Sequence, residues 1–60
     1  MSYYKIGDRV RVIQLSPGSK DIEVGDEGTI VNLISATLYR IKLDKGPSLD
    51  LNAQQFEKVG

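Results

Sequence analysis

Apolar and polar residues alternate over several short stretches of this chain, which is the spacing of β-strands that bury one face. The alternation is clearest in residues 38–43, where three apolar side chains share one face and two basic side chains share the other with Leu38. With the turn residues that separate such stretches, the pattern predicts an all-β fold of five strands. Their expected ranges are 8–15, 28–33, 38–43, 48–51 and 56–59.

Two connections and one strand depart from simple alternation. Residues 16–23 contain a Pro-Gly pair and little periodicity, which predicts a long surface loop with only Ile22 folding back onto the core. Residues 52–55 suit a single turn of 3₁₀ helix. In the second strand Ile30 and Val31 are adjacent apolar residues, which indicates a bulge, a strong bend or a strand that is apolar on both faces.

An apolar residue followed by Gly-Asp occurs twice, at residues 6–8 and 24–26, and each time a strand-like run follows. Glycine adopts positive φ without steric cost, and aspartate can bond to its own nearby backbone. The phrase therefore predicts a tight turn that leads into a strand. We also expect Gly25 and Gly28 to require glycine, through positive φ or close backbone approach, whereas alanine at Gly18, in the long loop, should carry a smaller penalty.

The inward positions of these strands define the expected hydrophobic core. Its predicted members are Val10, Val12, Ile30, Tyr39, Ile41, Leu49, Leu51 and Phe56, with Val24 added.

Composition limits the class of protein. Sixty residues make one domain, spanning 1–60, and the absence of cysteine and histidine excludes disulfides and a Cys/His zinc site. Eight basic and eight acidic residues cancel, whereas a general nucleic-acid binder is normally basic. No apolar run reaches membrane-spanning length and no secretory signal begins the chain. We expect a soluble cytoplasmic protein without membrane contact, metal or cofactor.

The order of elements and three segments resemble an SH3-like barrel of five strands. Residues 7–12 and 24–30 are similar to the KOW signature, a "GDxVxV" strand leading through a loop to "GxxGxV", and residues 51–59 complete the match. The chain also resembles small uncharacterised SH3-like proteins of bacteria and their phages and, more loosely, the photosystem I subunit IV barrel. Unrelated functions share this barrel, so the resemblance implies a fold more than an activity.

Two familiar activities of such barrels are disfavoured by missing residues. Polyproline recognition needs an aromatic-lined groove, but the chain has no tryptophan and its long loop has no aromatic residue. Methyl-lysine recognition needs a cage of several aromatic rings. Because Tyr39 and Phe56 are expected in the core, only Tyr3 and Tyr4 are left to build such a cage.

The leading hypothesis is a non-catalytic module that binds a protein partner or associates with itself as a homodimer. Loops on rigid scaffolds often carry binding residues, and exposed tyrosines can anchor an interface or stack on bases. The tyrosines could equally cover the open end of the barrel. The proposed contact residues are Tyr3, Tyr4, Pro17, Gly18 and Ile22.

The alternative is KOW-like binding of RNA or DNA, within a transcription or translation complex. It depends on four basic residues on outward strand faces that could contact phosphates: Arg9, Arg11, Arg40 and Lys42. The same residues could form ordinary solvated faces. The first and third strands are not expected to be neighbours, so the two basic pairs need not form one patch.

No residue pattern predicts catalysis or metal binding. The candidate hydroxyl nucleophiles are Ser16, Ser19, Thr29 and Ser35. The chain has no histidine, and none of these four is followed by lysine at a Ser-x-x-Lys spacing, so none has an activating base. An acidic run lacks the ligand spacing of an EF-hand and is better explained as a solvated surface. Its members are Asp21, Glu23, Asp26 and Glu27.

Overall fold

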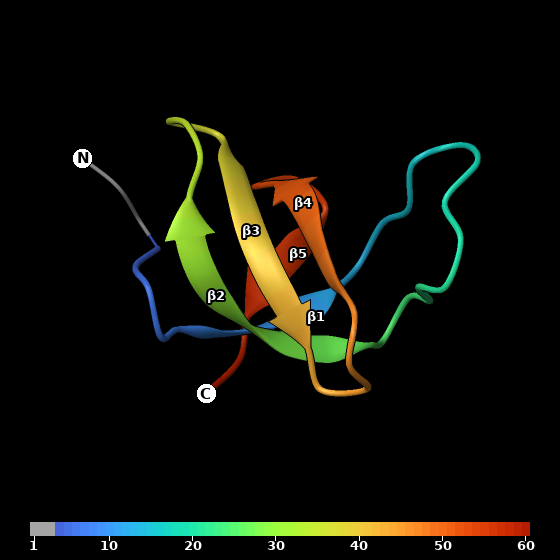
Figure 1. Ribbon diagram of the computed structural model, residues 1–60, viewed down its shortest axis with the longest axis horizontal. Coiled ribbons are helices and arrows are strands. Elements are labelled where there is room, and N and C mark those ends of the chain that lie inside the picture. Colours follow the sequence, from blue (N-terminus) through green and yellow to red (C-terminus); the bar gives the residue numbers. More distant parts are fainter. Residues whose placement is uncertain (1–3) are drawn as a thin grey trace.

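The computed structural model describes residues 4–60, which form five strands (Figure 1). The strands are β1 (Arg9–Val12), β2 (Glu27–Leu33), β3 (Leu38–Leu43), β4 (Ser48–Asn52) and β5 (Phe56–Lys58). Neighbouring strands are antiparallel and form one sheet in the order β4-β3-β2-β1-β5. The predicted all-β class is confirmed, and β2 separates β1 from β3 as expected.

The strand limits follow the predicted ranges with one larger difference. β3 has the expected limits, and β2, β4 and β5 each differ by one residue at one end. β1 was expected to continue to residue 15 but ends at Val12. The amides of Ile13 and Gln14 both donate to the carbonyl of Gln55, at 2.9 and 3.3 Å. Because two successive residues share one acceptor, the ladder stops here and the long loop begins.

Both Gly-Asp phrases form the same turn. Each turn begins one residue before the phrase, at Lys5 or Glu23. The carbonyl of this first residue accepts a hydrogen bond from the aspartate amide, at 3.0 Å in one turn and 3.1 Å in the other. The aspartate Oδ2, of Asp8 or Asp26, accepts in return from the amide of the first residue at 3.0 or 2.8 Å. The intervening glycines have φ of 99° and 100°, a region that favours glycine. The predicted tight turns are confirmed.

The two turns are also related to each other through the β1–β2 ladder. Val10 pairs with Gly28 at its centre, and the glycine of each turn donates its amide to a carbonyl of the opposite strand at 2.8 Å. Residues 5–12 and 23–30 therefore form a local two-fold repeat around this central pair.

β2 is irregular in its middle and crowded near its start. Its register against β3 shifts between Ile30 and Asn32, so Val31 is an extra residue and the predicted bulge is confirmed. At Gly28 a β-carbon would lie 2.5 Å from the backbone oxygen of Lys42. The expected close backbone approach at this glycine is therefore present.

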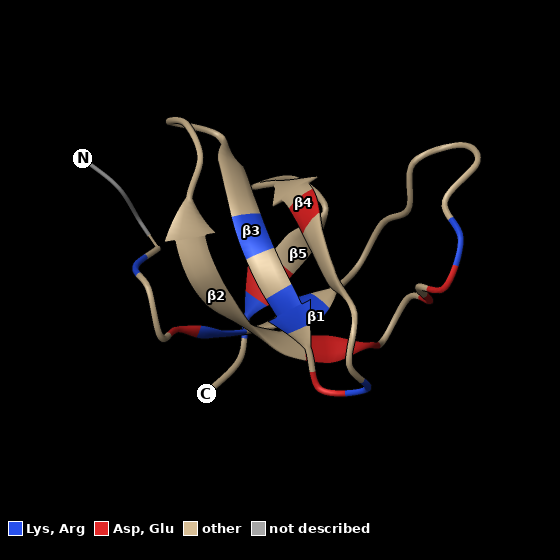
Figure 2. Ribbon diagram, viewed as in Figure 1, with Lys and Arg blue, Asp and Glu red and all other residues tan. Residues whose placement is uncertain are grey.

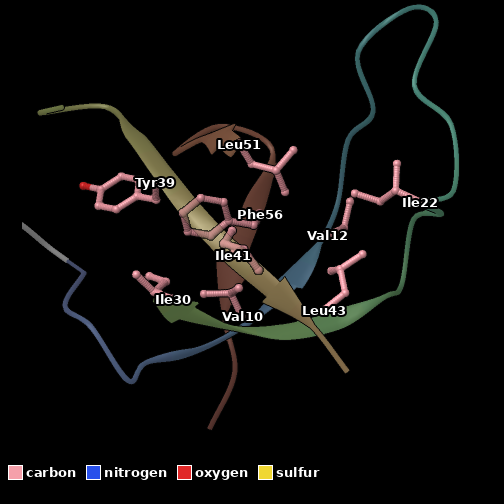
Figure 3. Packing of buried hydrophobic residues seen from close by; sticks show 9 residues of the cluster. All are labelled: Val10, Val12, Ile22, Ile30, Tyr39, Ile41, Leu43, Leu51 and Phe56. Atoms are coloured by element: carbon pink, nitrogen blue, oxygen red, sulfur yellow. The ribbon is translucent and has the colours of Figure 1, made fainter. Parts of the chain in front are cut away.

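The core lies inside the curled sheet (Figure 3). Seven predicted members are buried: Val10, Val12, Ile30, Tyr39, Ile41, Leu51 and Phe56. Leu43 and Ile22 complete the buried cluster, and Ile22 confirms the expectation that it folds back. Leu49 is only partly buried and packs against the cluster.

The prediction that Val24 belongs to the core is wrong. Its side chain is 61% exposed, because Val24 occupies the outer corner of the second Gly-Asp turn. Ile22, two residues earlier and only 7% exposed, fills the interior below this part of the loop.

The turn before β5 is simpler than the expected 3₁₀ helix. The amide of Gln55 donates to the carbonyl of Asn52 and that of Ala53 to the carbonyl of Thr37, both at 2.9 Å. Side chains of the same segment supply further bonds. Asn52 Oδ1 accepts from the amide of Gln54 at 3.0 Å, and Gln55 Oε1 accepts from that of Asn52 at 3.1 Å. Residues 4–60 contain no helix, and so none that is long and apolar enough to cross a membrane.

Candidate functional site

The two arginines of β1 are held by carboxylates. The two terminal nitrogens of Arg9 donate to the two oxygens of Asp44 at 2.7 and 2.6 Å, a bidentate geometry that strengthens the contact. Arg11 lies 3.4 Å from the carboxylates of both Glu27 and Glu57. These contacts join β1 to β2, to β5 and to the loop after β3, and occupy donors that a phosphate would need.

The basic residues of β3 also have hydrogen-bond partners, one a carboxylate and the other a backbone carbonyl. Arg40 Nε donates to a carboxylate oxygen of Asp50 at 2.9 Å, and the ammonium group of Lys42 donates to the backbone carbonyl of Gly46. Basic and acidic positions are interspersed over the outer face of the sheet (Figure 2). The structure therefore places the four predicted phosphate contacts on two separated strands, among carboxylates, and does not bring them together.

The acidic run has structural contacts of its own. Asp26 closes the second turn and lies 2.7 Å from the ammonium group of Lys45, while Glu27 faces the arginines of β1. Asp21 and Glu23 are exposed. Among residues 4–60, no three acidic side chains gather closely enough to hold a metal ion.

Two of these ion pairs make the stability of the fold sensitive to acid. The hydrogen bond from Arg9 lowers the pKa of the Asp44 carboxyl below its ordinary value of 3.8. The bond from Lys45 lowers the pKa of Asp26 in the same way. The folded chain then binds these protons more weakly than the unfolded chain. The contribution to stability is complete above the ordinary pKa and is lost as the pH falls through the lowered one.

We therefore expect the melting temperature to fall as the pH is lowered from about 5 to about 2, and Asp44→Asn to reduce that fall. Circular dichroism melts across this range measure both effects. Asp21→Asn is the matched control, because Asp21 is exposed and forms no ion pair with the described residues. Identical pH profiles for Asp44→Asn and the wild type would contradict the assignment.

Tyr4 contributes to the core boundary. Its ring packs edge-on against Tyr39 and Phe56, with ring centroids 5.4 and 4.9 Å apart, and the residue is half-buried. Tyr4 thus covers the open end of the core, one of the two roles considered from sequence. Tyr3 lies outside the described residues.

The other predicted contact residues are distant from Tyr4. Pro17 and Gly18 are exposed near the tip of the long loop, which projects from the opposite end of the molecule to residues 4–8 (Figure 1). Ile22 is buried, so its side chain supports the loop instead of offering a contact. The structure therefore does not bring these residues into one surface.

A different surface does combine exposed apolar side chains. Residues 30–39, the end of β2, the following hairpin and the start of β3, contain no Lys, Arg, Asp or Glu. This part of the ribbon is uniformly tan in Figure 2. Within it Val31, Leu33 and Ile34 are 43%, 41% and 40% exposed. The absence of charge over residues 30–39 is visible in the sequence. It did not indicate a binding surface there, because a strand and a short turn also account for it.

The fold explains why these side chains remain outside. The bulge at Val31 breaks the alternation that would bury every second residue of β2. Leu33 pairs with Tyr39 at the end of the sheet, beyond the centre of the core. Ile6, 62% exposed, joins them because Gly7 bonds to the carbonyl of Ile30 at 2.8 Å. We call Ile6, Val31, Leu33 and Ile34 the hairpin surface.

An open hollow lies beside the turn of the same hairpin and is also lined without charge, by Thr37, Asn52, Ala53 and Gln54. Residues 30–39 and this hollow are therefore an uncharged part of a described chain whose other strands and turns carry charges of both signs. Comparisons of the chain with protein-family models, with curated proteins and with solved structures find no match.

Proposed function

We propose that this chain is a non-catalytic protein-binding module with an SH3-like barrel fold, and that its partner contacts the hairpin surface. The observation that carries the proposal is the coincidence of exposed apolar side chains with a stretch of chain that has no charge. Contiguous exposed apolar area, rimmed by polar residues, is typical of protein-interaction sites.

The strand arrangement supports the barrel. β2 pairs with both β1 and β3, and β5 returns to pair with the far side of β1. This order curls the sheet around one core, with the long loop between β1 and β2 at one end (Figure 1). Such a scaffold leaves its loops and hairpins as the regions free to bind.

The hairpin is held in place before any partner arrives. The Ser35 hydroxyl accepts from the amides of Thr37 and Leu38 at 3.4 and 3.2 Å, and the amide of Ile34 donates to the carbonyl of Leu38 at 2.9 Å. Ordering a loop on binding costs conformational entropy, and a preformed loop reduces that cost. Apolar contact then contributes roughly 25 cal/mol for each Å² removed from water.

Nucleic-acid binding remains the alternative, but the contacts of the arginines favour it less. Phosphate binding by Arg9 or Arg11 would compete with the carboxylates that already hold them. Fluorescence anisotropy with single-stranded and duplex oligonucleotides separates the two hypotheses. Salt-sensitive binding that is abolished by Arg9→Glu with Arg11→Glu would support the alternative.

The direct test is site-specific photo-crosslinking in a lysate of the native host. A photoreactive residue in place of Leu33 should capture a discrete protein, because Leu33 is half-exposed within the hairpin surface. The same residue at Lys42, exposed on β3 outside that surface, is the matched control and should capture little. A third position, Pro17, tests the long loop. Equal capture at all three positions, or stronger capture at Pro17, would contradict the proposed surface.

A further inference from the structure

The two Gly-Asp turns present matching apolar corners at opposite ends of the β1–β2 ladder. Ile6 and Val24 occupy the same position in the two turns and are 62% and 61% exposed. Ile13 and Val31, the residues that directly follow the two halves of the repeat, are 45% and 43% exposed. Backbone bonds of adjacent residues bring Ile6 beside Val31 at one end and Val24 beside Ile13 at the other. The two ends are therefore alike in apolar character.

The first end, around Ile6 and Val31, has an excess of positive charge. Its turn begins with Lys5, which is exposed and forms no ion pair with the rest of residues 4–60. Asp8 is the carboxylate of this turn, and Lys58 lies 3.7 Å from it. Two cations thus accompany one anion, and the adjoining end of β2 has no charge to balance them.

The second end, around Val24 and Ile13, has an excess of negative charge. Glu23 stands where the first turn has a lysine, and Asp21 lies two residues before it; both are exposed. With Asp26 they make three carboxylates against Lys45 and Lys20. The acidic groups raise the pKa of Lys45. The main cause is its hydrogen bond to Asp26, and the negative charges of Asp26, Glu23 and Asp21 raise the pKa further.

These opposite charges decide which ends can meet. Two first ends in contact would oppose lysines, and two second ends would oppose carboxylates, whereas unlike ends place Lys5 near Glu23. Complementary charge selects partners and register, while apolar burial supplies most of the affinity. We propose that the chain associates with a second copy of itself head to tail, the first end of one copy docking on the second end of the next. This rests on the proposed function, since it assigns part of the hairpin surface to that contact.

Such a contact uses different surfaces on the two copies, so each dimer keeps one free end of each kind. Contacts of this type continue into rings or open chains. The whole described molecule exposes 4006 Å², and a stable interface buries about 1,000 Å² or more in total. Each end is built on two large exposed apolar side chains, so we expect weak, concentration-dependent association.

Charge reversal tests the contact by sedimentation velocity at low salt over a wide range of protein concentration. Lys5→Glu produces two acidic ends and Glu23→Lys two basic ends, so each variant alone should associate about three- to tenfold more weakly than the wild type. An equimolar mixture of the two should recover association, because every contact can then join unlike charges. The double variant should associate like the wild type.

Matched controls separate this effect from misfolding and from net charge. Both positions act in their turns through backbone groups, so circular dichroism melts of the single variants should match the wild type. Lys42→Glu makes the same charge change on β3, at a residue that belongs to neither end, and should leave association unaltered.

A wild-type chain that stays monomeric at every concentration would overturn the head-to-tail contact, as would a mixture that stays dissociated. The proposal that the hairpin surface binds a protein partner would stand after either result, provided that the photoreactive residue at position 33 still captures a different protein. Capture of a second copy of this chain, lost with Lys5→Glu, would support both.

Discussion

Replacing Ile41 with alanine is expected to unfold most of the protein at ambient temperature. The Ile41 side chain is 0% exposed, and its strand partners are Ile30 and Leu49. Truncating a buried isoleucine costs about 2–5 kcal/mol through lost transfer energy and the cavity left behind. A domain of this size has roughly 3–5 kcal/mol of net stability from its core, so the loss approaches the whole. Urea titration followed by circular dichroism measures it.

The matched control is Ile6→Ala, the same substitution at the most exposed large apolar residue of the described chain. It removes the same atoms from a position already in water, so the urea midpoint should change little. Equal losses of stability for the two variants would show that Ile41 is not interior. The control also tests function, because Ile6→Ala should weaken binding at the hairpin surface while leaving the fold intact.

Gly28→Ala is expected to have the second-largest effect, although it adds only one methyl group. The new β-carbon would lie 2.5 Å from the backbone oxygen of Lys42, 2.9 Å from Ile41 Cγ2 and 3.0 Å from Leu43 Cα. Two of these neighbours are backbone atoms of β3, so the β2–β3 ladder itself must move. Overpacking of this kind costs about 1–3 kcal/mol, which a urea midpoint resolves.

Gly25→Ala and Gly18→Ala provide the comparison. A β-carbon at either position meets nothing within 4 Å, but φ is +100° at Gly25 and +80° at Gly18. Both should lose about 1 kcal/mol through backbone strain alone. The sequence predicts a smaller penalty at Gly18 than at Gly25 and Gly28. The positive φ of Gly18 places its expected penalty near that of Gly25 and below that of Gly28. A Gly28→Ala midpoint no lower than these two would contradict the close approach.

The proposed binding and the fold depend on different residues, which makes them separable by experiment. The hairpin surface lies beyond the buried cluster and is positioned by backbone bonds such as that from Gly7 to Ile30. The barrel can therefore remain folded while single exposed side chains are exchanged. Loss of capture without loss of stability is the pattern expected of a binding site.

Local sequence determined the strands because side-chain alternation is a property of the strand itself. Tyr39 and Ile41 face inward in the structure as their spacing indicates, and the adjacent Ile30 and Val31 indicated the bulge. The Gly-Asp turns were predictable for the same reason, since their hydrogen bonds close within four residues. Elements whose stabilising contacts are local can be predicted without a tertiary structure.

The candidate sites could not be predicted in this way, because they depend on contacts between distant segments. From the sequence, Arg9 was a candidate phosphate contact. In the fold its guanidinium group bonds to Asp44, which lies 35 residues away in the loop after β3. Val24 is apolar and was therefore expected in the core, but its side chain is exposed and Ile22 is the buried residue of this segment. By itself, the sequence determined which residues form strands and turns. Only the tertiary structure decided which charges are neutralised and which apolar side chains stay in water, since burial and ion pairing arise when strands remote in the chain meet.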